Sequence, residues 1–245
     1  MRKFAYKELD QEGLETLQTI SEAHRFNEWM FETILPYVVE GPILEVGSGI
    51  GNISSFFLER GMPICLSDIR ENYCGFLEEK FSQHPQLIDI LQLDLVHPQF
   101  ETEYAEWLGH FHTVYALNVV EHIEDDGLAL ANIRKLLAPK GRVIILVPAY
   151  QMLYNTFDKN LYHYRRYTKS TLSAVFEENS IPVLTKFHFN FIGIFGWILS
   201  GSILKKETIP SGQMKLYDTL VPIFRLIDRL LLKQIGLSVI AIGEN

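Results

Sequence analysis

The segment Ile43–Asn52 constrains the fold of this chain more than any other stretch. It starts with two apolar residues, reaches an acid at Glu45, continues into a turn with three glycines, and leads into a helix-like run, 53–60. This order predicts a strand, a tight turn and the start of a helix, which together present backbone N–H groups to a nucleotide-like ligand. Glycine is needed in such a turn because a Cβ would block the close approach of a ligand to the backbone.

The spacing of the glycines indicates the kind of ligand. A dinucleotide-binding turn reads G-x-G-x-x-G, but position 52 is Asn and the third glycine comes early, giving E-x-G-x-G-x-G. This pattern resembles motif I of the class I S-adenosylmethionine-dependent methyltransferases. The resemblance implies that the cofactor is bound by Glu45, Gly47, Ser48, Gly49 and Gly51.

Three further motifs follow in the order that the resemblance implies. The short apolar run 64–67 ends in Asp68-Ile69, and an acid about 20 residues after the glycines is placed to bind ribose hydroxyls. The run 87–93 ends in Asp94-Leu95, similar to the family's acid–apolar pair, whose acid reaches the adenine amino group. A fourth strand, 113–117, ends in Asn118 and resembles motif IV.

These motifs imply an α/β fold with a Rossmann-like, seven-stranded sheet in the order 3-2-1-4-5-7-6, its last strand antiparallel. The expected parts are an N-terminal helical cap (1–40), a methyltransferase core (41–190 and 236–245) and a helical insertion (191–235). The implied cofactor is S-adenosylmethionine, with S-adenosylhomocysteine as product. Two alternatives stay open: a module that binds the cofactor without turnover, and an NAD-dependent enzyme, which Asn52 and the Asp94-Leu95 pair disfavour.

Charge and composition indicate which partners and which cellular compartment to expect for the chain. The net charge of −8 argues against nucleic acid as the main partner, because a phosphate backbone requires a basic face. Two cysteines, Cys65 and Cys74, cannot form a disulfide framework. Residues 1–10 are charged and lack an apolar signal segment, so we expect a cytoplasmic protein.

Apolar residues at helical intervals precede the first motif and predict two helices, broken near Pro36-Tyr37 or at Gly41-Pro42. In the family such a piece often packs over the cofactor or closes the substrate pocket. A helix that only covers one face of the sheet is the alternative.

The segment 158–168 places His163, Arg165, Arg166 and Tyr167 in an H-x-R-R-Y-T run. It resembles a subgroup of bacterial methyltransferases (type 11/12-like), some encoded with or fused to glycosyltransferase-like domains. Arginine offers a planar fork for an anion and tyrosine a stacking surface with a polar end, so Arg165, Arg166 and Tyr167 are predicted to bind the substrate. The alternative is a surface loop whose arginines pair with Glu177 or Glu178.

Methyl transfer to a hydroxyl or an amine needs an aligned acceptor and a group that removes a proton. His122 and His163 are the candidate bases. Asn118, Glu121 and His122 also resemble the E-x-x-E-H pattern of a quinone-pathway O-methyltransferase, in which the acids and the histidine hold a divalent metal. Because Asn118 replaces the first acid, we predict no metal site, with Glu121 and His122 as the only candidate ligands from this motif.

The insertion 191–235 is apolar, and its segment 216–235 predicts an amphipathic helix that Pro222 opens or kinks. It can wall a hydrophobic pocket, form a homodimer interface, or lie on a membrane surface, which the basic Lys205-Lys206 would favour. Asn190 and several glycines argue against a true membrane span. We favour the pocket wall, and therefore a small or lipid-like, amphiphilic acceptor, with oxygen as the expected atom.

Overall fold

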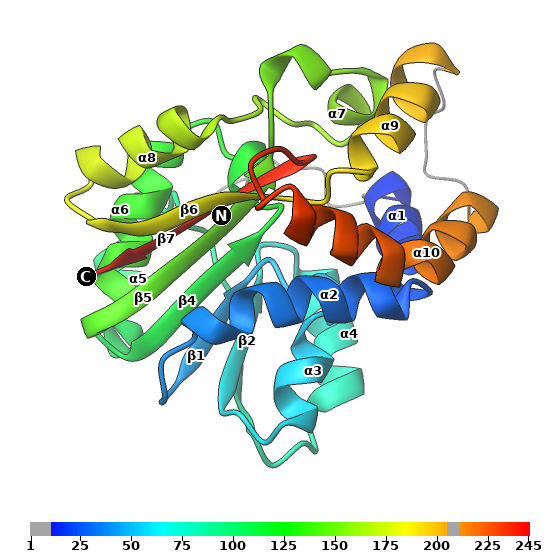
Figure 1. The fold of residues 1–245 in the computed structure, drawn as a ribbon. Helices are drawn as coiled ribbons and strands as arrows, with labels where there is room; N and C mark the ends of the chain where they lie inside the picture. The colour runs from blue at the N-terminus through cyan, green and yellow to red at the C-terminus, as the bar shows by residue number, and fades with distance from the viewer. Residues whose placement is uncertain (1–10, 205–210) are drawn as a thin grey trace.

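The computed structural model describes residues 11–204 and 211–245, and it shows one seven-stranded sheet with helices on both faces (Figure 1). The strands follow the order β3-β2-β1-β4-β5-β7-β6 across the sheet. Their bounds are β1 Ile43–Val46, β2 Ile64–Asp68, β3 Leu87–Gln92, β4 Phe111–Leu117, β5 Leu137–Pro148, β6 Val183–Phe189 and β7 Ser238–Glu244.

Helices connect and cover these strands. The α-helices are α1 Gln11–Ser21, α2 His24–Ile34, α3 Ser54–Glu59, α4 Glu71–Phe81, α5 Phe100–Glu103, α6 Asp126–Leu136, α7 Thr156–Asn160, α8 Lys169–Glu178, α9 Gly193–Trp197 and α10 Ser211–Leu230. The shorter elements are η1 Leu35–Tyr37, η2 Ala105–Trp107, η3 Val120–His122, η4 Gln151–Leu153 and a π-helical stretch, η5 Ile198–Ile203.

The strand pairing matches the sequence-based prediction. β1 pairs in parallel with β2 and β4, and β4 pairs in parallel with β5. β7 is inserted between β5 and β6 and runs antiparallel to both. The predicted order, including the antiparallel last strand, is confirmed.

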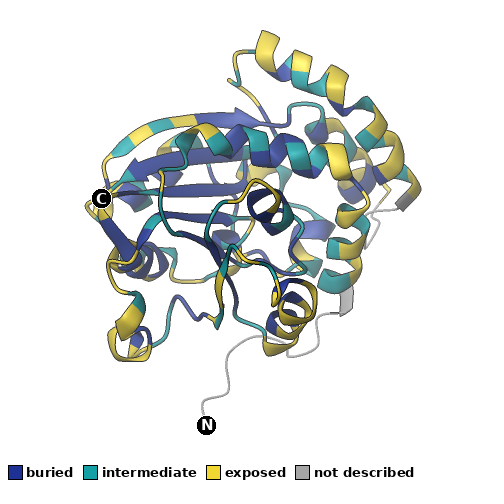
Figure 2. Cartoon of the chain, turned by 90° about the horizontal axis from the view of Figure 1, so that it is seen from below, coloured by how far each residue is buried: buried dark blue, intermediate teal, exposed yellow. Residues whose placement is uncertain are grey.

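Alternate residues of the central strands supply two apolar cores, one on each face of the sheet. On β4, Val114 and Ala116 face α6 and α8, whereas Tyr115 faces α2 and α3. In Figure 2 the central strands are mostly dark blue, whereas the edge strands β3 and β6 are partly exposed and the outer sides of the helices are exposed. The division into cap, core and insertion stays a prediction, although α2 contributes Phe31 and Ile34 to one of these cores.

Several element boundaries differ from the expected ones for local reasons. The two N-terminal helices separate at residues 22–23, and the region of Pro36 forms η1 at the end of α2. β5 starts at Leu137, because this residue pairs with Phe111 before the register shifts and the strand continues from Arg142. α8 starts at Lys169, because Thr168 and Thr171 form a reciprocal cap at its first turn.

α10 does not bury the whole apolar side of its amphipathic pattern. Leu216, Ile223 and Leu230, which helical spacing places on one side, are exposed, while Val221 and Asp228 are buried. The reason is the Asp228 carboxylate, which accepts hydrogen bonds from the backbone N–H of Asn190 (2.7 Å) and of Phe191 (2.8 Å) where β6 ends. These bonds fix the polar residue inside and turn part of the apolar side of α10 outward.

No helix within residues 11–204 and 211–245 is long and apolar enough to cross a membrane. The basic pair Lys205-Lys206 and the charged segment 1–10 lie outside the described residues.

Candidate active site

A cavity of about 1510 Å³ opens at the carboxyl ends of the parallel strands. Open α/β sheets bind ligands at this edge, where the chain connections leave β1 and β4 in opposite directions. All predicted cofactor residues except Gly51 line the cavity, namely Glu45, Gly47, Ser48, Gly49, Asp68, Ile69, Asp94, Leu95 and Asn118.

The glycine turn after β1 has the backbone that its sequence suggested. Gly47 has a φ of 73°, and a Cβ there would lie 2.4 Å from a methyl carbon of Val119. Gly51 has a φ of 77°, but its Cβ would meet the ring of Phe81 at 2.3 Å. Gly51 therefore permits packing of the turn on α4 and is not among the residues that line the cavity, so its role as a cofactor contact stays a prediction.

Asp68 joins this turn to the end of β2. Its carboxylate accepts hydrogen bonds from the backbone N–H of Gly49 (3.0 Å) and of Arg70 (3.0 Å). Burial raises the pKa of this carboxyl, and the bonds from Arg70 and Gly49 oppose the rise. Each oxygen keeps acceptor capacity toward the cavity, because a carboxylate oxygen can accept two bonds.

Asp94 holds the corresponding position after β3. Its backbone N–H donates to the Tyr104 hydroxyl (2.9 Å), and its carboxylate accepts from the N–H of Val96 (2.9 Å). The side chain is thereby fixed at the wall of the cavity.

Glu45 lies beneath the turn, with its carboxyl group accepting a hydrogen bond from the Ser54 hydroxyl. Burial raises the pKa of Glu45 to about 7, a rise that the Ser54 bond opposes and the charge of Asp68 adds to. The group is therefore poised between its neutral and charged forms near neutral pH.

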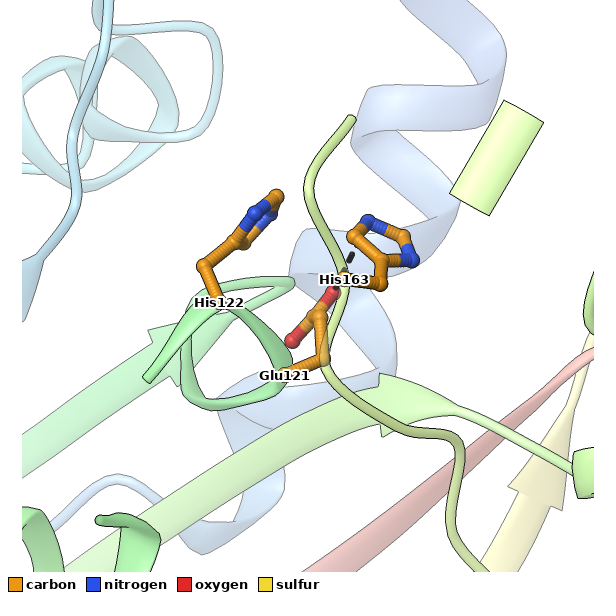
Figure 3. Close-up of side chains that lie close together, drawn as sticks. All are labelled: Glu121, His122 and His163. Carbon is orange, nitrogen blue, oxygen red and sulfur yellow. Dashed lines mark ion pairs between the residues drawn. The ribbon is translucent and has the colours of Figure 1, made fainter. Parts of the chain in front are cut away.

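On the other side of the cavity, Glu121, His122 and His163 lie together (Figure 3). Glu121 and His122 belong to η3, directly after β4, whereas His163 comes from the segment after α7. The Nε2 atom of His163 lies 4.0 Å from a Glu121 oxygen, and the two imidazole rings are 4.6 Å apart and nearly perpendicular. The structure thus brings both predicted bases and both candidate metal ligands into one cluster.

The environment shifts the titration of this cluster. Burial raises the pKa of Glu121 to about 8, and no hydrogen-bond partner of its two oxygens lies in the described part of the chain. His122 is exposed to the cavity, but the surrounding protein and the neighbouring His163 lower its pKa, so the ring is neutral at pH 7.

Asp158 orients His163. This buried carboxylate accepts hydrogen bonds from Nδ1 of His163 (2.8 Å), from Nε of Arg166 (2.8 Å) and from the backbone N–H of Asn155 (2.9 Å). Although burial alone would raise it, these partners lower the pKa of Asp158, so the group is ionised. Nδ1 of His163 is therefore the nitrogen that donates to Asp158, and Nε2 faces Glu121.

The positive cluster expected in the segment 158–168 is largely neutralised. Arg166 is buried, pairs with Asp158, and lies 4.6 Å from the ring centre of Trp197. Arg165 pairs with Asp126 at 3.1 Å, and Tyr167 donates to the same carboxylate at 2.7 Å. Arg165 and Tyr167 do not line the cavity, whereas Arg166 does, so direct contact with a substrate in the cavity is supported for Arg166 alone.

The cavity wall includes residues from both segments for which the sequence offered such a role without naming individual contacts. Thr16, Leu17 and Ile20 of α1 line it, as do Trp197, Met214 and Tyr217 from the insertion that was favoured as a pocket wall. Helical periodicity could indicate that these residues lie on a buried face, but not which cavity that face closes. The pairing of Asp158 with His163 was missed, although the two residues are close in sequence.

Comparison with known proteins agrees with this geometry. Residues 44–143 match the family model described as a methyltransferase domain. The chain is 29% identical over 111 residues to the highly reducing polyketide synthase stpks1 of Strobilurus tenacellus, an alignment that covers 42% of this chain and 4% of that protein. The chain therefore corresponds to a small part of this curated relative.

Solved structures share the fold at low identity. A SAM-dependent methyltransferase from Archaeoglobus fulgidus superposes with a TM-score of 0.57 at 16% identity, covering 89% of this chain and 94% of that one. Geranyl diphosphate C-methyltransferase from Streptomyces coelicolor A3(2) superposes with a TM-score of 0.63 at 10% identity, covering 94% and 84%.

The sheet order, the glycine turn and the acids after β2 and β3 define a class I methyltransferase fold around a cofactor cavity. With the family match, they show that residues 44–143 form a methyltransferase domain of the class I, S-adenosylmethionine-dependent type, whose methyl donor is S-adenosylmethionine.

Glu45 provides a test of the site's electrostatics. Its folded pKa of about 7 lies above its ordinary value of 4.5, so its contribution to stability is present below pH 4.5 and is lost as the pH rises to about 7. The loss is on the order of 3 kcal/mol. Urea unfolding at pH 5 and pH 8 should show a fall in the free energy of unfolding for the parent that is clearly smaller for Glu45→Gln. The exposed Glu59→Gln is the control, and identical pH dependence in all three proteins would contradict the assignment.

Proposed function

We propose that this chain transfers the methyl group of S-adenosylmethionine to a hydroxyl oxygen of an amphiphilic acceptor with an anionic or polyhydroxylated head. The observation that carries the proposal is the continuous cavity, which runs from the glycine turn past the Glu121–His122–His163 cluster to the apolar insertion. Its volume of about 1510 Å³ exceeds the roughly 300–1,000 Å³ usual for ligand pockets. It therefore has room for the cofactor and a sizeable acceptor together.

The cofactor would lie along the ends of β1, β2 and β3. Asp68 would accept hydrogen bonds from the ribose hydroxyls, and Asp94 would accept one from the adenine amino group, as in the family. The reactive sulfonium would then point toward the ends of β4 and β5, where Asn118 and the cluster lie.

The cluster supports oxygen as the acceptor atom. A hydroxyl must lose its proton as the methyl group arrives, and neutral imidazoles beside the acceptor are suited to take it. Asp158 holds Nδ1 of His163 and leaves Nε2 directed into the cluster, whereas the lowered pKa of His122 makes that ring a weak base. We propose His163 as the group that takes the proton of the acceptor hydroxyl, with His122 positioning that hydroxyl.

The remaining wall supports an amphiphilic acceptor. Arg166 borders the cavity beside Trp197, and because its Nε and Nη1 bind Asp158 and the Ala149 carbonyl, we propose that Nη2 donates to an anionic head. Met214, Tyr217 and the glycines Gly193 and Gly196 form the wall on the side of the insertion, where an apolar body would lie.

The first prediction concerns cofactor binding. Asp68→Ala should weaken the binding of S-adenosylmethionine and S-adenosylhomocysteine by a few kcal/mol, because hydrogen bonds to charged groups are worth about 1.5–3 kcal/mol each. Calorimetry checks this, with the exposed Asp89→Ala as control and NAD as a ligand that should not bind. Unchanged affinity in a folded Asp68→Ala protein, or binding of NAD alone, would contradict the cofactor assignment.

The second prediction concerns the acceptor, which is found by incubating the protein and methyl-labelled cofactor with lipid and polar metabolite fractions. With that acceptor, Arg166→Gln should raise the Michaelis constant about 10- to 100-fold, as expected for the loss of a charge-assisted bond. Arg165→Gln should stay within about twofold, since its partner Asp126 lies outside the cavity. Both variants should bind the cofactor like the parent.

Parent-like kinetics in both arginine variants, or a small cationic acceptor, would contradict the proposed acceptor class. Cofactor binding without transfer to any fraction would favour the binding-module alternative.

The outer face of the insertion suggests how such an acceptor is reached. Ten of the eighteen large apolar side chains exposed in the described chain belong to 191–235, among them Phe195, Leu199, Ile223 and Leu226. The insertion carries six Lys or Arg against three Asp or Glu, in a chain of net charge −8. We propose that this face contacts an anionic membrane surface, to which apolar area and basic residues both contribute.

Flotation with anionic vesicles tests this contact. The parent protein should float, Leu226→Glu should float less, and Leu184→Glu, an equally exposed leucine on β6, should behave like the parent. A parent that does not float but forms a dimer disrupted by Leu226→Glu would instead show that the face is a homodimer interface.

A further inference from the structure

We propose that Glu121, His122 and His163 form a binding site for one divalent transition-metal ion of the zinc class, at the acceptor end of the cavity. Each residue offers one ligand atom, and the three atoms lie within 4.8 Å of one another. The part of the chain that the structure describes holds one such group of histidines and acids. Figure 3 shows the Glu121 carboxylate and the His163 ring facing each other, with His122 on the same turn as Glu121.

The strongest observation is the Glu121 carboxylate. Its side chain is fully buried, and neither oxygen has a hydrogen-bond partner among the described residues. Burying a carboxyl group without partners is costly, so buried acids are normally hydrogen-bonded, ion-paired or bound to a metal. Nε2 of His163 lies 4.0 Å from a Glu121 oxygen, beyond hydrogen-bond distance, and the guanidinium of the neighbouring Arg166 is held by Asp158. A cation between the two groups would satisfy both.

The orientation of His163 provides a second observation, independent of Glu121. Asp158 accepts a hydrogen bond from Nδ1 at 2.8 Å, and Arg166 and Asn155 hold this carboxylate in place. Metal-binding histidines commonly donate their second ring nitrogen to a carboxylate, which fixes the ring and makes the free nitrogen a better ligand. His163 is prepared in this way, with Nε2 directed at Glu121.

The ligand types indicate the ion. Two imidazoles and one carboxylate suit zinc and its first-row neighbours, whereas magnesium and calcium prefer oxygen ligands alone. Bonds to such an ion are about 2.0–2.2 Å long, so the three side chains must approach by about an ångström on binding. Three protein ligands leave a coordination position open toward the cavity, as in catalytic zinc sites.

The role of the ion rests on the proposed O-methylation, but its binding does not. At the open position an acceptor oxygen would be polarised and its proton made more acidic. In the metal-loaded protein the two imidazoles and Glu121 would hold the ion, so the acidified hydroxyl would lose its proton to solvent, not to a histidine, before the methyl group arrives.

Metal binding is measured directly, without cofactor or acceptor. Tag-free protein treated with chelator is titrated with Zn²⁺ in competition with a chromophoric chelator, and with Co²⁺, whose visible absorption reports its ligands. We expect one Zn²⁺ per chain in the parent and in His110→Ala, an exposed histidine outside the cavity. Affinity should fall at least about tenfold in Glu121→Gln, His122→Ala and His163→Ala, and millimolar Mg²⁺ should not displace Zn²⁺.

Binding of S-adenosylmethionine to each variant shows that the fold is intact. The proposal is overturned if the parent binds no Zn²⁺ at a stoichiometry of one, or if the three ligand variants bind it as tightly as His110→Ala. Because no acceptor is used, failure to find a methylated product leaves this result unaffected. A metal-free protein that is fully active would overturn the role of the ion in the reaction, whereas the titrations alone decide whether the site binds metal.

Discussion

Parallel pairing of β2, β1, β4 and β5 is the constraint on which the remaining structure depends. It forces the loops that follow these strands to one edge of the sheet, although they are far apart in the sequence. The glycine turn, Asp68, Asp94 and Asn118 meet there because each directly follows a strand of this set or its neighbour β3. The cofactor side of the cavity is thus a consequence of strand order and direction.

The part of the cavity wall that we propose for the acceptor depends on one buried carboxylate. Asp158 is buried, and hydrogen bonds from His163, Arg166 and the N–H of Asn155 stabilise its negative charge. Satisfying this one group ties α7 to the H-x-R-R-Y-T segment and, through the contact of Arg166 with Trp197, to α9. The bond from His163 that stabilises the Asp158 charge also orients the His163 ring toward Glu121. The need to stabilise a buried charge therefore determines how the histidine of the cluster is oriented.

Features with short-range causes could be predicted from the sequence. The glycine turn, the strand-end acids and the cap at Thr168 each depend on residues within a few positions, and the strand order followed from the family resemblance. The contact between His163 and Glu121 could not be predicted, because it joins segments on either side of α6 and β5. The arginines illustrate the same limit: Arg165 pairs with Asp126 and Arg166 with Asp158, where Glu177 and Glu178 were the expected alternatives. At Gly51 the sequence indicated that the turn needs a glycine, but it could not show that the ring of Phe81 is what excludes a Cβ there.

In the insertion, the hydrogen bonds of one buried acid determine which apolar side chains of α10 are exposed. Asp228 must face inward to cap the end of β6, so α10 cannot bury every apolar residue that its pattern offers. Leu216, Ile223 and Leu226 are left outside, while Met214 and Tyr217 line the cavity. A helical layer that is apolar toward both solvent and cavity exposes surface at a cost to stability unless something covers each side. An amphiphilic acceptor in the cavity and a lipid surface outside would cover the two apolar sides of this layer. An acceptor that moved from the membrane into the cavity would then stay in contact with apolar side chains of the insertion.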